Sequence, residues 1–221
     1  MGILQTIGMV LLAVFAVTNI ALVLYSKRKE YGFVAQIWRR YRWGMFIQAI
    51  GALLLVFAVA FTIWDVPGLK YGWLHLFYSE GGNVFVRPLQ EGSESSYTIV
   101  RLLPVLFLGA FLFGIPFLAK FEEDQFRRGF ESWPQIMRQS VKFGLIHCLA
   151  GIPLAAGIAL IVSGLFYGYH YKRSYDQNVR RLGHEGAQDE AVMVSTAYHS
   201  MWNTIIVCVL LGFTVYAVFS S

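Results

Sequence analysis

The chain has 221 residues, of which 57% are hydrophobic and 14% charged, and its formal net charge is +5. A soluble domain of this length cannot bury so much apolar surface, and several apolar runs are long enough to cross a bilayer. The basic residues lie between these runs rather than on one polar face, which indicates membrane topology and argues against nucleic acid as a partner. The composition therefore predicts an all-α, multi-pass integral membrane protein.

The first two predicted spans cover residues 3–25 and 45–64. The first run has no basic region before it and is followed by a basic cluster at 27–29, so we interpret it as a membrane span rather than a signal peptide. The segment between the two spans is rich in arginine and aromatic residues, as expected at the headgroup boundary. A long connection, 65–97, follows and is predicted to be an outer loop, acidic in its later part.

The interval 134–173 decides the topology, because it is either one long helix or two helices broken near Gly151 and Pro153. Proline ends or kinks a helix, and glycine eases a turn. With a break, nearly all lysines and arginines fall in connections on one side of the membrane, whereas without it those between 172 and 181 move to the other side. The positive-inside rule therefore favours the break.

The remaining runs complete the predicted fold. A third span covers about 101–120, and the last helix covers about 191–218, after a polar stretch, 175–190, that is predicted to be a cytoplasmic loop. The sequence thus predicts about six transmembrane helices in one structural domain, with both termini on the non-cytoplasmic side. Residues 1–100 supply two helices and the outer loop, and residues 101–221 supply a core of four helices.

Three polar clusters lie within or beside the apolar helices, where ionisable residues are costly and are candidates for function. In the first cluster, Glu123 and Arg127 are spaced i,i+4 and can pair on one helix face, whereas Glu122 points elsewhere. Taken alone, this cluster is typical of a solvated helix end on the cytoplasmic side.

The other two clusters each place a histidine in an apolar helix. His147 follows Phe143 by one turn, and His199 precedes Asn203 by one turn. Taken separately, the first is typical of a buried histidine or a haem ligand, and the second of hydrogen bonding between packed helices.

Together the clusters, in the order EExxxR, FxxxH and HxxxN, resemble the motif set of the CPBP family (CaaX protease and bacteriocin-processing) of intramembrane proteases. A glycine-rich stretch, 164–174, which ends in a basic residue and a hydroxyl, resembles a further motif of that family. The resemblance covers about residues 106–210 and implies an endopeptidase that hydrolyses a peptide bond of a membrane-associated protein or peptide.

The resemblance also implies roles for single residues. Glu122 would act as general base on a water that His147 helps to hold. His199 and Asn203 would hydrogen-bond the oxyanion of the tetrahedral intermediate. Structural support would come from three further residues of these motifs: Glu123, Arg127 and Phe143.

Other interpretations are open at this point. Glu122, His147 and His199 could bind zinc as a His₂Glu set with one position left for water. The polar Asp124 and Gln125, where family members have apolar residues, fit a non-catalytic subunit, scaffold or assembly factor of a larger membrane complex. The two histidines could also be axial ligands of a haem, or contacts of a quinone.

Overall fold

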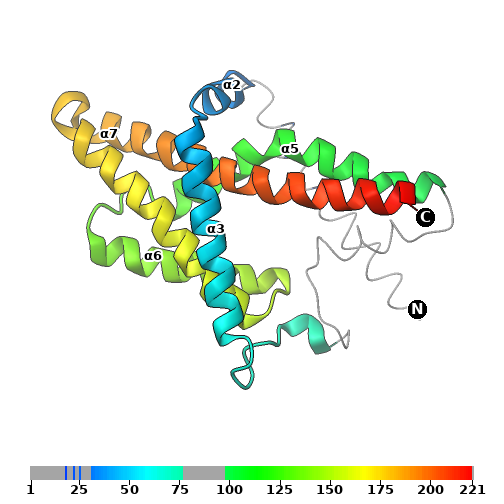
Figure 1. Ribbon diagram of the computed structural model, residues 1–221. Coiled ribbons are helices and arrows are strands. Elements are labelled where there is room, and N and C mark those ends of the chain that lie inside the picture. Colours follow the sequence, from blue (N-terminus) through cyan, green and yellow to red (C-terminus); the bar gives the residue numbers. More distant parts are fainter. Residues whose placement is uncertain (1–17, 19–21, 23–24, 26–30, 77–97, 221) are drawn as a thin grey trace.

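The computed structural model describes residues 31–76 and 98–220, together with Thr18, Leu22 and Tyr25. The first predicted span, the basic cluster at 27–29 and the later part of the outer loop lie outside the described residues. Within the described ranges every element is helical. In chain order they are α2 (Tyr31–Arg39), α3 (Trp43–Ile63), the short 3₁₀ helix η2 (Trp73–Leu76), α5 (Thr98–Phe126), α6 (Trp133–Ile146), the 3₁₀ helix η3 (His147–Ala150) and α7 (Leu154–Ser220) (Figure 1).

Three of the described helices are long and apolar enough to cross a membrane. They are Trp43–Ile63, Val105–Phe126 and Leu154–Ser220. Many of the large side chains on α3 are exposed, as expected for a helix that faces lipid rather than a protein core. The all-α fold and the presence of helices suited to a bilayer are therefore confirmed.

Helix α7 is a hairpin rather than one straight rod. Gly183 has φ 71° and ψ 179°, a conformation that favours glycine, and it divides α7 into a first and a second half. The prediction of a loop at 175–190 is wrong, because this stretch is helical on both sides of that turn. Small and aromatic residues of the stretch pack between the two halves, where Tyr175 and Ala187 join a buried cluster with Tyr171. Figure 1 shows the turn projecting beyond the rest of the protein.

The predicted break between two helices in the interval 134–173 is confirmed. Helix α6 ends at Ile146, η3 follows, and Gly151 adopts a left-handed conformation with φ 85° before α7 begins at Leu154. The segment before η2 covers the break, because the backbone N–H of Leu154 donates to the carbonyl of Tyr71 at 3.1 Å. The indole of Trp73 likewise donates to the carbonyl of Leu149 at 3.0 Å.

Glycines allow α6 to pack closely against the first half of α7. A Cβ atom on Gly164 would lie 3.0 Å from Cα of Ser140, and one on Gly168 would lie 2.5 Å from Cγ2 of Ile136. The two glycines, four residues apart, therefore give α7 a small-residue face against which α6 packs.

The main core lies where α3, α5, α6 and both halves of α7 meet. Helix α3 runs across α7 rather than alongside it, whereas α5 follows the second half of α7 (Figure 1). The buried residues of this core are Val56, Phe126, Phe143, Ala159, Tyr167 and Trp202. Two of these six, Phe143 and Tyr167, also contact the polar residues of the candidate site.

Candidate functional site

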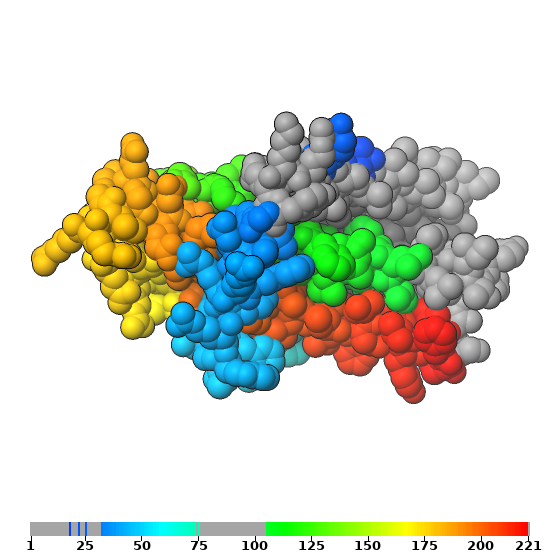
Figure 2. Space-filling view, turned by 90° about the horizontal axis from the view of Figure 1, so that it is seen from above, coloured from blue at the N-terminus to red at the C-terminus, as the bar shows by residue number. Residues whose placement is uncertain are grey.

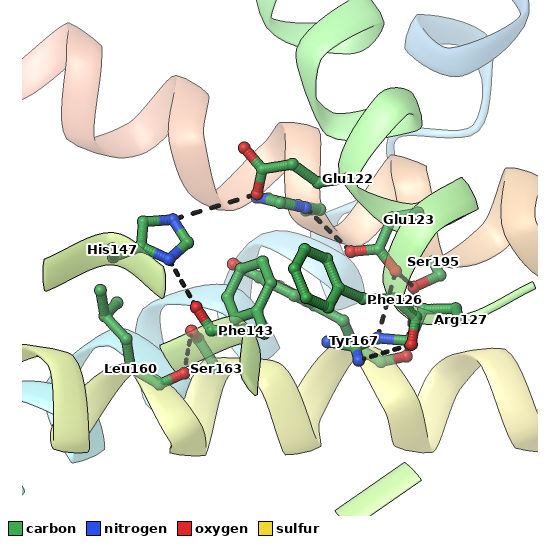
Figure 3. A network of polar contacts seen from close by, with 11 residues as sticks. Glu122, Glu123, Phe126, Arg127, Phe143, His147, Leu160, Ser163, Tyr167 and Ser195 are labelled. Atoms are coloured by element: carbon green, nitrogen blue, oxygen red, sulfur yellow. Dashed lines mark hydrogen bonds and ion pairs between the residues drawn. The ribbon is translucent and has the colours of Figure 1, made fainter. Parts of the chain in front are cut away.

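The two glutamates at the end of α5 face different surroundings. Glu123 and Arg127 are completely buried, and the Nε atom of Arg127 lies 3.5 Å from Oε2 of Glu123. The i,i+4 pair predicted from the sequence is therefore confirmed. The side chain of Glu122 is 31% exposed and turns away from this pair toward His147 (Figure 3).

Glu123 connects α5 to the second half of α7. Its Oε1 atom lies 2.9 Å from Nδ1 of His199, and its Oε2 atom accepts a hydrogen bond from the hydroxyl of Ser195. The hydroxyl of Ser195 also lies 3.2 Å from the carbonyl oxygen of Tyr167, in the first half of α7. The carboxylate thus accepts hydrogen bonds on both oxygens beside a buried guanidinium, which compensates the cost of burying its charge.

The ring of His199 is held between aromatic side chains. It stacks on Tyr167 with centroids 4.4 Å apart and an interplanar angle of 15°, and it meets the ring of Phe143 edge-on at 5.6 Å. Because a carboxylate only accepts hydrogen bonds, Nδ1 of His199 carries the hydrogen in its contact with Glu123. The Nε2 atom is thereby directed toward Oε2 of Glu122, at 3.8 Å.

His147 reaches the same carboxylate oxygen from a different element. It begins η3, and its Nδ1 atom lies 2.7 Å from the carbonyl oxygen of Phe143. A carbonyl can only accept, so Nδ1 of His147 also carries a hydrogen and Nε2 faces Glu122. That Nε2 atom lies 4.0 Å from Oε2 of Glu122.

The geometry around Glu122 suits a small hydrogen-bonding molecule. Its Oε2 atom is buried and has no hydrogen-bond partner among the described residues. The separations of 3.8 and 4.0 Å from the two imidazole nitrogens are too long for direct hydrogen bonds. A water that lies beside the straight path from Oε2 of Glu122 to one of these nitrogens could be about 2.8 Å from both atoms. Neutral rings would present lone pairs there, so the site favours a molecule with hydrogens to donate.

Phe143 is the common neighbour of the groups in this site. Its ring lies 4.7 Å from the ring of His147, and the guanidinium carbon of Arg127 lies 5.4 Å from its centroid. It is buried among these groups and Phe126, which meets it edge-on at 5.5 Å. These contacts place Phe143 against both histidines and Arg127, and its supporting role stays a prediction.

Asn203 is the predicted site residue that the network does not include. It follows His199 by one turn of α7 and is partly buried. No hydrogen bond joins its amide to Glu122, to either histidine or to any other residue in the described ranges. Its role as a donor to an oxyanion stays a prediction.

The spacing of the three predicted zinc ligands does not fit that metal. Tetrahedral zinc with ligand distances of about 2.0–2.1 Å places neighbouring ligand atoms about 3.3–3.4 Å apart. The Oε2 atom of Glu122 lies 3.8 and 4.0 Å from Nε2 of His199 and His147, so the groups stand too far apart. Over residues 31–76 and 98–220, no set of three His, Cys, Asp or Glu side chains could hold a metal ion.

Two residues of the site escaped the sequence analysis. Ser195 precedes His199 by one turn, so its i,i+4 spacing on the same face was a signal that could have found it. Tyr167 lies inside the glycine-rich stretch, but its contact with His199 joins the two halves of α7 and has no local signal.

Comparisons with known proteins gave no match: no protein-family model fits the sequence, no curated protein is similar to it, and no solved structure is similar to the fold.

Proposed function

We propose that the protein is a membrane-embedded endopeptidase of the CPBP type, which cleaves a peptide bond of a membrane-associated protein or peptide. One observation carries the proposal: a buried oxygen of Glu122, which has no hydrogen-bond partner among the described residues, faces the Nε2 atoms of His147 and His199 at 4.0 and 3.8 Å. These groups come from α5, η3 and α7, as the motif order EExxxR, FxxxH and HxxxN requires. A carboxylate beside two imidazoles is suited to activating water.

In the proposed reaction a water lies between Glu122 and His147. Glu122 takes a proton from this water as the water oxygen attacks the scissile carbonyl carbon. Nε2 of His147 accepts a hydrogen bond from the second hydrogen of the water. The tetrahedral intermediate then collapses, the C–N bond breaks, and Glu122 returns the proton to the leaving amine. The net change is the addition of one water across the peptide bond, and no residue is consumed.

The proposed oxyanion site needs His199 in its doubly protonated form. Nδ1–H is already directed to Glu123 at 2.9 Å, so only a second proton, on Nε2, allows the ring to donate to the oxyanion. The amide of Asn203 would supply a further donor, and one such donor is worth about 3–4 kcal/mol in the transition state.

The six-helix topology belongs to the same proposal. In it, residues 3–25, α3, α5, α6 and the two halves of α7 each cross the membrane, and the hairpin end of α7 lies in the cytoplasm. Single cysteines at Arg180 and at Asp65, introduced after both native cysteines are replaced by alanine, provide the test. A thiol reagent that cannot cross membranes should modify the Asp65→Cys variant from outside and the Arg180→Cys variant only after permeabilisation. The reverse pattern would reject this orientation.

The activity is tested with purified protein in lipid vesicles and a set of membrane-anchored reporter peptides, with new peptide termini identified by mass spectrometry. Glu122→Gln should abolish the new termini, because the amide cannot accept the proton. Asp124→Asn is the matched control: it makes the same chemical change two residues away, where the carboxylate pairs with Lys120 and Arg128, and cleavage should continue. Equal cleavage by wild type and Glu122→Gln, or none by either, would reject the proposed function.

A further inference from the structure

The chain between α3 and η2 packs against the break between α6 and α7. We call residues 69–73 the strap; they follow the end of α3 and lead into η2. Figure 1 shows this segment at the end of α3 opposite to α2. Figure 2 is seen from above, with α2 and the start of α3, in blue, toward the viewer. The strap contacts the break through its backbone and through one side chain.

The backbone of the strap supplies hydrogen-bond acceptors to the start of α7. The carbonyl of Leu69 accepts the N–H of Ala155 at 2.8 Å. The carbonyl of Tyr71 accepts the N–H of Leu154 at 3.1 Å. The first N–H groups of a helix have no acceptor within that helix, and the apolar core of a bilayer offers no water to replace one. The strap therefore satisfies two donors that the fold would otherwise leave unpaired.

Gly72 brings the strap into direct contact with the backbone of the break. A Cβ atom on Gly72 would lie 2.6 Å from the carbonyl oxygen of Gly151 and 2.7 Å from that of Ile152. Both oxygens belong to the turn that joins η3 to α7, and neither can rotate away as the end of a side chain can. The strap and the break are thus packed with no room for a side chain between them, so a displacement of one displaces the other.

Trp73 extends the contact from the start of α7 to η3. Its indole N–H donates to the carbonyl of Leu149 at 3.0 Å. Leu149 lies near the end of η3, and among the described residues no backbone N–H donates to its carbonyl. A 3₁₀ helix of four residues closes few hydrogen bonds of its own, so contacts from outside decide how it is oriented. The indole supplies such a contact.

The same short helix begins with His147 of the candidate site, two residues before Leu149. The bond between Nδ1 of His147 and the carbonyl of Phe143 fixes the imidazole relative to α6. Nε2 of His147 lies 4.0 Å from Oε2 of Glu122, which is too long for a direct hydrogen bond. No bond between these two side chains fixes their separation, so it depends on where η3 lies.

We propose that Trp73 is a positioning residue, which sets the distance between His147 and Glu122 by holding η3 through the carbonyl of Leu149. The proposal rests on the proposed function, in which these two side chains share the water that attacks the peptide bond. It also goes beyond the three motifs, because the strap lies outside residues 106–210, the part of the chain that resembles the CPBP family.

The test removes the indole N–H of Trp73 and keeps an aromatic ring. One variant replaces Trp73 by benzothienylalanine, which has sulfur in place of the N–H and almost the same volume. The other is W73F, which has a smaller ring. W64F is the matched control, because Trp64 is 39% exposed, as Trp73 is, and its indole makes no hydrogen bond to any residue that the structure describes.

Cleavage of reporter peptides in lipid vesicles by the full-length protein is the first readout. Both Trp73 variants should lose about tenfold in kcat while KM stays within about twofold, because a displaced imidazole affects the attack rather than peptide binding. The benzothienylalanine variant keeps the packing of the ring, so the comparison holds even if W73F does not fold. W64F should cleave as the wild type does.

The second readout does not depend on cleavage. Histidine is labelled with an NMR-active nitrogen isotope, and the signals of His147 are identified by their loss in H147Q. These signals should shift or broaden in both Trp73 variants, because η3 is no longer held, and they should stay at their wild-type positions in W64F.

The two readouts distinguish a failure of this proposal from a failure of the proposed function. Unchanged His147 signals in both Trp73 variants, or the same change in W64F, would overturn the positioning role. Displaced signals in a protein whose wild type cleaves no peptide would reject the protease and leave the hold of Trp73 on η3 established. Displaced signals with a wild-type kcat would show that this hold does not serve the reaction, and the proposal would fail.

Discussion

Nδ1 of His199 lies 2.9 Å from Oε1 of Glu123, and the two side chains are only 4% and 0% exposed. Glu123 also accepts the hydroxyl of Ser195 and pairs with Arg127, so it is the centre of a buried network between α5 and α7. Its neighbour Glu122 is partly exposed, and one of its oxygens has no hydrogen-bond partner in the part of the chain that the structure describes. The two adjacent glutamates therefore have different roles in the structure. Glu123 fixes the imidazole of His199, and Glu122 is available to a ligand.

Replacing Glu123 by glutamine should destabilise the fold strongly. The substitution keeps the size of the side chain but leaves the guanidinium of Arg127 buried without the carboxylate that pairs with it. Removing one partner of a buried ion pair costs about 3–5 kcal/mol, so the unfolding temperature in detergent should fall markedly. Adding Arg127→Met to this variant should recover part of the loss, because the unpaired charge is then removed.

Asp124→Asn is the control for that measurement. Its carboxylate pairs with Lys120 and Arg128, and all three side chains are partly exposed to solvent. Exposed pairs contribute about 0–1 kcal/mol, so this variant should unfold close to the wild-type temperature. Similar losses in Asp124→Asn and Glu123→Gln would contradict the assignment of Glu123 as the structural carboxylate.

Tyr167 should act as a positioning residue for His199. Its ring stacks on the imidazole at 4.4 Å, so Tyr167→Leu removes the flat surface that holds the ring plane while keeping the site apolar. If the proposed activity is correct, kcat should fall by about 10- to 100-fold with little change in KM, because a small misplacement of a catalytic group is costly. Tyr167→Phe retains the ring and should stay within a few-fold of wild type. A Leu variant as active as the Phe variant would show that the stack has no such role.

Local patterns in the sequence predicted the parts of the structure that depend on local geometry. The pair of Glu123 and Arg127 follows from i,i+4 spacing, and the break at Gly151 and Pro153 follows from the conformational limits of those residue types. The approach of α6 to Gly164 likewise follows from the absence of a side chain on that face.

The contacts that complete the site depend on tertiary structure and could not be predicted in this way. Glu123 meets Ser195 and His199 across 72 and 76 residues of chain, and nothing local to either segment specifies that register. The stretch 175–190 was mistaken for a loop because its polar composition conceals an inner face that packs between the two halves of α7. Outside the bilayer only one face of a helix is apolar, so the helix no longer appears in the sequence as a continuous apolar run.

Chelation should leave the protein unchanged. The separations of 3.8 and 4.0 Å around Glu122 exceed those between tetrahedral zinc ligands, so the proposed reaction relies on the carboxylate itself. Treatment with EDTA followed by gel filtration should alter neither the unfolding temperature nor the cleavage of reporter peptides, and elemental analysis should find no stoichiometric zinc. Loss of cleavage on chelation, with recovery on addition of zinc, would instead show that the three side chains close around a metal.

Gly144→Ala should destabilise the packing that places His147. A Cβ atom at this position would lie 2.6 Å from the carbonyl oxygen of Gly157 and 2.7 Å from the backbone nitrogen of Ile161. Both are backbone atoms of α7 and cannot rotate away, so α6 would have to move outward and carry with it the following turn that begins at His147.

The expected cost of Gly144→Ala is about 1–3 kcal/mol, seen as a lower unfolding temperature in detergent. Gly51→Ala is the matched control, since Gly51 also lies inside a helix but has open space where the new methyl group would be. That change should be neutral or stabilise by up to about 1 kcal/mol, because alanine favours helix over glycine. If Gly144→Ala were as stable as Gly51→Ala, the close contact between α6 and α7 would be wrong, and so would the position of His147 beside Glu122.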